Sequence, residues 1–197
     1  MVKTTKMLQE ELASYGDPAN KIARLARAGE LVPVVRGLYE TDPATSPWVL
    51  AGCIYGPSYV SFDAALAYHG LIPEGVRSIT SATFEKRKSK AYDTPFGAFL
   101  YRDVPSRAFP HGLVVAEEGG RPFRIACAEK ALCDKLYDLH PVSSRRELAR
   151  LLAEDLRIEA ATLAQLDDEY VDFLADQYQS RNVRLFAALL ERGLPYE

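Results

Sequence analysis

The pattern of apolar and polar positions predicts two helices at the start of the chain, over residues 4–15 and 17–29. The second helix is amphipathic. Ile22, Leu25 and Ala26 cluster on one of its faces, while polar and basic side chains occupy the other face. We expect the apolar face to pack against the first helix and the polar face to meet solvent or a ligand.

Local signals mark the ends of the second helix and place a β-hairpin after it. Asp17 is suited to the N-cap, and Pro18 to the first helical position, where its missing N–H costs nothing. Gly29 can adopt the left-handed conformation that ends a helix. Residues 31–34 and 38–40 are then predicted to pair as two short strands.

Basic side chains gather on the polar face of this helix and at the turn of the hairpin. Asn20, Arg24 and Arg27 fall within about 60° of one another on the helix, with Lys21 to one side. Arg36 stands at the turn. A helix that enters a groove and a hairpin that reaches phosphate are the parts with which a winged helix binds DNA. The alternative is a helix whose basic face is simply solvated.

The segment 41–47, TDPATSP, predicts a boundary between two domains because it is rich in Pro, Thr and Ser. We therefore expect a winged-helix domain over residues 1–42 and a second domain over 47–197. A winged helix usually has three helices before its wing, and only two are predicted here. Either the N-terminus is trimmed, or a helix over residues 47–55 supplies the third.

The second domain is predicted to contain an antiparallel sheet between helices, which makes the whole chain α+β. A buried helix over 47–55 and a helix capped by Ser61 and ended by Gly70 come first. Runs of β-branched residues predict an antiparallel meander of four strands, 76–84, 97–102, 113–116 and 123–126. The remainder is predicted to be helical, over residues 125–139, 168–178 and 181–192. A further helix is predicted to begin at Ser144, which forms a capping box with Glu147. These last helices form a bundle or a homodimer surface.

Composition narrows the classes of protein to which the chain can belong. It has 197 residues, 48% of them hydrophobic, and a net charge of −3, so it is not a protein that coats nucleic acid everywhere. No apolar run reaches the roughly 20 residues that span a bilayer, and the first residues carry charges where a signal peptide is apolar. We expect a cytoplasmic protein that does not contact membranes.

Cysteine and histidine spacing indicates neither a metal site nor a disulfide framework. Cys53, Cys127 and Cys133 form no CxxC pair and are expected to be buried thiols. The three histidines lack the spacing of metal ligands, and His69 is expected to be a hydrogen-bonded structural residue. No phosphate loop or other cofactor motif occurs, so no cofactor is predicted.

A second concentration of positive charge lies between two predicted strands, in the segment EKRKSKAYDTP. A basic loop at a hairpin tip is usually solvated, but this one could also contact nucleic acid or an acidic partner. Its basic residues are Lys86, Arg87, Lys88 and Lys90.

The acidic and basic residues of the helix at 125–139 do not indicate a nuclease. A restriction-type site requires Asp followed by Glu-x-Lys on a strand, whereas Glu129 and Lys130 are consecutive on a predicted helix. We interpret Glu129 and Asp134 as residues that make helix-terminal and tertiary hydrogen bonds. No catalytic residue is predicted.

Three segments resemble the AbiEi family of antitoxins. The run KIARLARAGELVPVVRGLYE is similar to the family's N-terminal winged helix, with its Gly-Glu-Leu helix exit and Arg-Gly-Leu-Tyr wing. Residues 128–134 are similar to its Glu-Lys-Ala-Leu-x-Asp signature. The third segment matches at Tyr59, Ser61, Ala65, Leu66, His69, Gly70, Leu71 and Ile72.

The resemblance implies the antitoxin of a type IV toxin–antitoxin pair. Such a protein represses the shared promoter through its winged helix and counters a nucleotidyltransferase-type toxin, with or without direct contact. Its partners would be the double-stranded DNA of its own promoter and, functionally, the toxin. Two alternatives remain: a protein-interaction module that no longer binds DNA, and, last, a restriction-nuclease-like enzyme.

Overall fold

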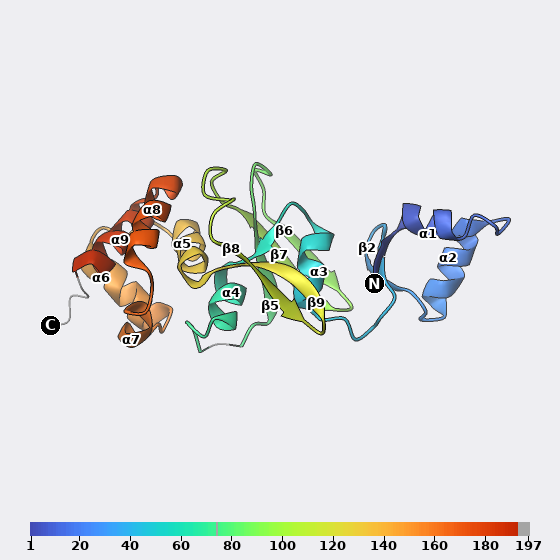
Figure 1. The fold of residues 1–197 in the computed structure, drawn as a ribbon, viewed down its shortest axis with the longest axis horizontal. Helices are drawn as coiled ribbons and strands as arrows, with labels where there is room; N and C mark the ends of the chain where they lie inside the picture. The colour runs from blue at the N-terminus through green and yellow to red at the C-terminus, as the bar shows by residue number, and fades with distance from the viewer. Residues whose placement is uncertain (74, 193–197) are drawn as a thin grey trace.

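The computed structural model describes residues 1–73 and 75–192 and shows an α+β protein. Three regions follow one another along an elongated molecule (Figure 1). A small N-terminal unit lies at one end, a six-stranded sheet with helices lies in the middle, and a group of helices lies at the other end.

The N-terminal unit is a three-stranded antiparallel sheet with two helices on one side. Its core consists of Leu8, Ile22 and Leu31. The first helix is shorter than the predicted 4–15: it begins one residue later, where the strand that pairs with the hairpin ends, and it ends at Glu11, after which residues 12–16 form turns. The elements are β1 (Val2–Thr4), α1 (Thr5–Glu11), α2 (Pro18–Arg27), β2 (Val32–Val35) and β3 (Leu38–Glu40).

The central region is a sheet of strand order β6-β7-β5-β4-β9-β8. Figure 1 shows its helices against the sheet, with α5 on the side of the C-terminal helices. The strands are β4 (Tyr59–Val60), β5 (Ser78–Thr83), β6 (Lys90–Thr94), β7 (Gly97–Asp103), β8 (Leu113–Glu118) and β9 (Arg121–Ala126). The helices are α3 (Pro47–Ile54), α4 (Phe62–Tyr68) and α5 (Ala128–Asp138).

The predicted antiparallel meander is wrong, because this sheet is mixed. Strand β5 pairs in parallel with β7, and β4 pairs in parallel with β9. The unpredicted strand β6 forms a tight hairpin with β7, and this reversal returns β7 in the same direction as β5. The segment at 90–94 therefore belongs to the sheet edge rather than to a loop.

Helix α3 does not complete the N-terminal unit. It contacts β4, β5 and β9, and its buried residues Val49, Leu50 and Ile54 belong to the central core. A third helix from residues 47–55 is therefore excluded as part of a winged helix. The N-terminal unit has strand β1 and two helices before its hairpin.

The C-terminal helices pack on one another and on α5. Buried Asn182 joins them to the end of α5: its amide oxygen accepts from the N–H of Val142 at 2.9 Å, and its nitrogen donates to the carbonyls of Leu136 and His140. The elements are α6 (Arg145–Arg150), a π-helical turn (Leu151–Asp155), α7 (Ala160–Leu163), α8 (Asp168–Tyr178) and α9 (Arg181–Arg192). The last two match the predicted bounds. The sequence also predicts that Gly193 and Pro195 end the last helix, and these two residues lie outside the described residues.

Several local predictions can be compared with single side chains. His69 makes a 2.7 Å hydrogen bond with the carbonyl of Ala126, as expected of a structural histidine. Ser144 caps α6, but Glu147 accepts from the N–H of Ser143 rather than completing the usual box. Cys53 is exposed, so the prediction of three buried thiols is wrong at that position.

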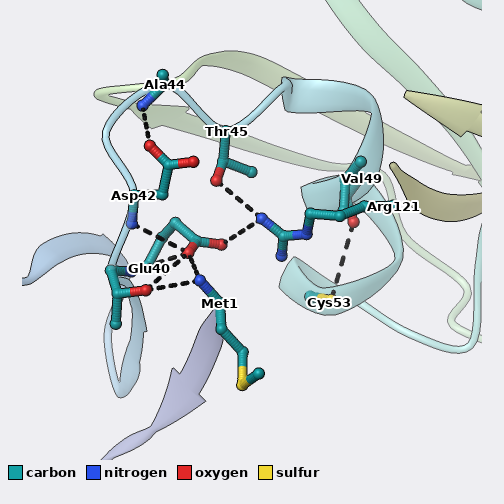
Figure 2. A network of polar contacts seen from close by, with 9 residues as sticks. Met1, Glu40, Asp42, Ala44, Thr45, Val49, Cys53 and Arg121 are labelled. Atoms are coloured by element: carbon teal, nitrogen blue, oxygen red, sulfur yellow. Dashed lines mark hydrogen bonds and ion pairs between the residues drawn. The ribbon is translucent and has the colours of Figure 1, made fainter. Parts of the chain in front are cut away.

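A buried carboxylate connects the N-terminal unit to the central sheet (Figure 2). Glu40, at the end of β3, is fully buried and accepts a 3.0 Å hydrogen bond from Arg121 at the start of β9. Arg121 also donates to the hydroxyl of Thr45 at 2.8 Å. The amino group of Met1 and the N–H groups at positions 41 and 42 complete the shell around Glu40. We call this arrangement the Glu40–Arg121 bridge.

The bridge holds Glu40 in its charged form. Burial alone would raise the pKa of this carboxyl, but its hydrogen bonds and the two positive charges outweigh burial and lower the pKa from 4.5 to about 2. A lowered pKa stabilises the fold above pH 4.5, and this stabilisation is lost as the pH falls from 4.5 towards 2.

We expect acid to destabilise the wild-type protein more than the variant Glu40→Gln. The shift from 4.5 to about 2 corresponds to roughly 3 kcal/mol of unfolding free energy that only the wild type loses on acidification. Urea unfolding at pH 7 and near pH 2.5 measures this difference. Glu118→Gln, at an exposed position in β8, is the matched control. An equal loss in wild type and Glu40→Gln would contradict the role of the bridge.

Candidate nucleic-acid interface

Helix α2 forms as its local signals predict. The Asp17 carboxylate accepts from the N–H of Asn20 at 3.0 Å, and Pro18 occupies the first turn. Gly29 has a φ of +77°, which allows the chain to leave the helix and enter β2. Ile22 is 4% exposed and faces Leu8 in the core of the N-terminal unit. These contacts fix which face of α2 points outward.

The outward face of α2 carries most of the predicted DNA contacts. Asn20, Arg24 and Arg27 are all exposed. Within the part of the chain that the structure describes, neither arginine makes an ion pair or a side-chain hydrogen bond. In Figure 1, α1 and α2 lie on the side of the N-terminal unit that faces away from the central sheet. The arginine face of α2 is therefore open to a large ligand.

Lys21 lies at the margin of this face. It is half-buried, and its Nζ sits 5.2 Å from the centre of the Tyr15 ring in the turn between α1 and α2. This contact draws the ammonium group towards that turn. Lys21 is consequently a poorer candidate for base contact than the two arginines, although it remains near enough to the helix start to meet a phosphate.

Arg36 projects from the tip of the hairpin. Val35 pairs with Leu38, which leaves a two-residue turn of Arg36 and Gly37. Gly37 has a φ of +83°, and its carbonyl accepts from the N–H of Thr5 at 2.9 Å. The turn is thus held against the start of α1, and Arg36 is exposed at its edge.

Acidic residues of the N-terminal unit do not neutralise this surface. Glu11 pairs with Lys3 at 2.6 Å, and Glu10 lies 3.9 Å from Lys6, so both acids are matched within β1 and α1. Helix α2 itself contains three basic residues and no acidic one. Asp17 and Glu30 flank the helix at its two ends, so α2 with its flanks has three basic and two acidic residues, a small positive excess on a chain that is negative as a whole.

The second basic patch is not a free hairpin tip. Its segment connects β5 to β6, and two of its residues are engaged with the protein. Lys86 donates to the carbonyl of Gly56 at 3.2 Å and lies over the Tyr55 ring, while the N–H of Arg87 donates to Asp103. Lys88 is exposed, and Lys90 begins β6. This patch belongs to the central sheet, and no contact among the described residues joins it to α2.

A buried polar cluster was missed at the level of the sequence. Lys130 and Asp134 of α5 are both fully buried and pair at 2.9 Å. Asp134 also accepts from Ser61 at 2.5 Å and from Tyr59 at 3.0 Å, both at the end of β4. Tyr178 of α8 contacts both charged groups. We call these five residues the Asp134 cluster.

The electrostatics of the Asp134 cluster indicate a structural role. Burial, reinforced by the negative charge of Asp134, raises the pKa of the Tyr59 and Tyr178 hydroxyls well above the usual value. Both tyrosines thus stay neutral donors to the carboxylate. The i, i+4 spacing of Lys130 and Asp134 was a visible signal, but such pairs usually lie on a solvated helix face. The expectation that Asp134 makes tertiary hydrogen bonds is confirmed, and Glu129 likewise accepts from the N–H of Asp167.

Metal-binding groups and membrane-spanning helices are absent from the described ranges. Over residues 1–73 and 75–192, no group of three or more His, Cys, Asp or Glu side chains is placed to hold a metal ion. In the same residues, no helix is long and apolar enough to cross a membrane.

Comparison with known proteins shows the fold alone. Neither the protein-family models nor the curated proteins gave a match. Among solved structures, the chain is similar to the crystal structure of the RV2827C protein from Mycobacterium tuberculosis, with a TM-score of 0.60 and 16% sequence identity. The match covers 99% of this chain and 73% of that one. The arrangement of all three regions therefore recurs in a protein of very different sequence.

We expect Asp134→Ala to destabilise the fold by about 3–5 kcal/mol, because it leaves a buried ammonium and three hydroxyls without their acceptor. The paired change of Lys130→Met with Asp134→Leu should recover the part of this loss that comes from the unpaired ammonium, since no charge then remains buried, while the three hydroxyls still lack their acceptor. Guanidinium unfolding with far-UV circular dichroism measures both. Arg184→Met, at an exposed position of α9, is the control and should change the free energy of unfolding little. A loss below about 1 kcal/mol in Asp134→Ala would contradict the structural role.

Proposed function

We propose that this chain is a DNA-binding transcriptional regulator whose helix α2 enters the major groove. The observation that carries the proposal is the outward face of α2, where Arg24 and Arg27 are exposed and have no described protein partner. Arginines on a helix face can donate two hydrogen bonds to guanine or bind phosphates. Asn20 beside them has the amide that reads adenine.

The order of elements supports a winged-helix interpretation of the N-terminal unit. Strand β1 is followed by two helices and a hairpin, and β3 pairs with both β1 and β2. In such a unit the second helix is the recognition helix, and the hairpin is the wing that reaches the backbone. Arg36 at the hairpin turn is then placed to contact phosphate.

The wider role that we propose is that of an antitoxin in a type IV toxin–antitoxin pair, and it rests on the AbiEi resemblance. The protein would act in the cytoplasm, without a cofactor or catalysis of its own, and repress the promoter it shares with a nucleotidyltransferase-type toxin. The three resembling segments lie on α2 with its hairpin, on β4 with α4, and on α5. The last two meet in the Asp134 cluster, so the resemblance extends to residues that hold the second domain together.

A protein-interaction module is the second candidate function, and the charge of the chain favours it. The net charge is −3, and the α8–α9 surface exposes Asp168, Glu169, Asp172 and Glu191. A basic protein partner would bind there rather than at α2. The two functions predict different results when charges are removed. A DNA-binding regulator should lose DNA binding when the arginines of α2 are replaced, and an interaction module should lose its protein partner when the acidic residues of α8 and α9 are replaced.

We expect Arg24→Ala and Arg27→Ala each to weaken binding of DNA from upstream of the protein's own gene by about 1–3 kcal/mol if the side chain reads a base. Fluorescence anisotropy with specific and scrambled duplexes, repeated over a salt titration, measures the affinity and the number of phosphate contacts. Arg184→Ala, an exposed arginine of α9, is the matched control and should leave binding unchanged.

Unchanged DNA binding in both α2 variants would exclude α2 as the recognition helix. Equal, weak binding of specific and scrambled DNA by the wild type would exclude the regulator and favour the protein-interaction module. A pull-down with Asp172→Asn and Glu191→Gln variants would then locate the protein partner.

The α2 variants also distinguish the antitoxin role from repression of the promoter. We expect a chain with both Arg24→Ala and Arg27→Ala to lose repression of a promoter reporter but still rescue growth when the neighbouring nucleotidyltransferase is induced, because the second domain is intact. Growth rescue and reporter activity in one strain measure both. Loss of repression and rescue together would show that counteracting the toxin also depends on α2.

A further inference from the structure

A cavity of about 280 Å³ lies between α3 and the edge formed by β8 and β9. Its walls are largely aromatic: Trp48 contacts Phe123 with 5.9 Å between ring centres, and Phe109 contacts Tyr59 in a tilted arrangement with 5.1 Å between ring centres. Ligand sites in proteins are usually apolar hollows with a few polar groups, and this volume is near the lower limit of their range. The cavity therefore suits a small ligand with one or two rings.

A glycine lines this cavity at a position where a larger side chain can be introduced. Gly52 lines the cavity from the middle of α3, and a Cβ built at this position would have no atom within 4 Å. Glycine is the least favourable helix residue after proline, and no close contact at position 52 requires it. A leucine at this exposed lining position would add bulk at the rim of the cavity.

A buried hydroxyl without a partner also lines the cavity. Ser58 Oγ is one of two buried side-chain polar atoms that find no hydrogen bond among the described residues. Buried polar groups in folded proteins are almost always hydrogen-bonded. The Oγ itself exposes almost no surface to the cavity, so a rotation of the Ser58 side chain about χ1 would bring this hydroxyl, which can both donate and accept, to an oxygen or nitrogen at the edge of a ligand.

The charge at the mouth of the cavity selects an anion. Arg124 of β9 lines the cavity and is exposed, and its guanidinium makes no hydrogen bond or ion pair with any residue that the structure describes. Its fork of donors matches a carboxylate, which can accept two hydrogen bonds side by side. The Glu40–Arg121 bridge lies close by: Figure 2 shows Cys53, another lining residue, beside Arg121.

We propose that this cavity binds a small planar aromatic carboxylate, with its ring against Trp48 and Phe123, its carboxylate at Arg124 and an edge atom near Ser58. The cavity provides stacking surfaces, a free cation and an unsatisfied hydroxyl in one place. The proposed ligand contacts only residues of the central region, so the site does not require that the chain binds DNA.

The probe for the test is 2-naphthoate, with 2-naphthamide as its uncharged counterpart. Trp48 is the only tryptophan in the sequence, so the indole N–H gives one cross-peak in a ¹⁵N–¹H spectrum and reports on the cavity directly. We expect 2-naphthoate to shift this peak saturably with a dissociation constant of about 1 mM or below, given the size of the ligand. The amide should bind at least about five-fold more weakly, since it cannot pair with Arg124.

Two variants and a control locate the site. Gly52→Leu adds bulk at the rim of the cavity and should weaken binding of 2-naphthoate, while Arg124→Gln should weaken it about five-fold and remove the preference over the amide. Arg184→Gln, on α9, should bind like the wild type. The thermal midpoint of each variant shows that it is folded, and if Gly52→Leu does not fold, Arg124→Gln with both probes decides.

Three results would overturn the proposal. They are no shift of the Trp48 peak up to about 5 mM 2-naphthoate, equal affinity in wild type and folded Gly52→Leu, or equal affinity of the acid and the amide for the wild type. DNA binding is measured separately, so failure of the regulator proposal would leave these outcomes unchanged.

Discussion

The charge of one buried carboxylate, Asp134, constrains the whole second half of the molecule. It must be surrounded by donors, and these come from three places: Lys130 on its own helix, Ser61 and Tyr59 at the end of β4, and Tyr178 at the end of α8. An unpaired charge in this position would cost several kcal/mol. The sheet, α5 and the C-terminal helices are therefore kept in one arrangement by a single set of polar contacts, and apolar packing around them completes the core.

A second buried carboxylate, Glu40, has the same function between the N-terminal unit and the central sheet. Arg121 reaches it from β9, and Val34 and Leu38 of the hairpin join the central core on the same side. Because the unit is attached through its sheet, helix α2 is left on the outer side, where Arg24 and Arg27 meet solvent (Figure 1). The proposed DNA surface is thus a consequence of how the unit is attached. In both places a carboxylate is buried away from water and is surrounded by hydrogen-bond donors, as a buried charge requires.

The N-terminal helix and hairpin could be predicted because their signals are local: a capping Asp17, a proline, and glycines at Gly29 and Gly37 that need positive φ. Helices α8 and α9 were predicted to the residue for the same reason. Sheet order could not be predicted, since β4 has only two residues. The parallel pairing of β5 with β7 depends on a hairpin between β6 and β7, and the five residues of β6, KAYDT, do not alternate between apolar and polar side chains as a half-buried strand would. The burial of Lys130 could not be predicted either, because its partners Tyr59 and Tyr178 lie far away in the sequence. The same holds for the cavity beside Gly52, whose walls come from four separate segments.

DNA binding by the outer face of α2 is the central proposal. Amide hydrogen exchange of the full chain, with and without duplex from upstream of its gene, tests this claim directly because it reports every helix at once. We expect slower exchange over residues 17–29 and at the hairpin turn of Arg36 and Gly37, with α8 and α9 unchanged. Protection confined to the 86–90 segment, or no protection anywhere despite saturating DNA, would contradict it.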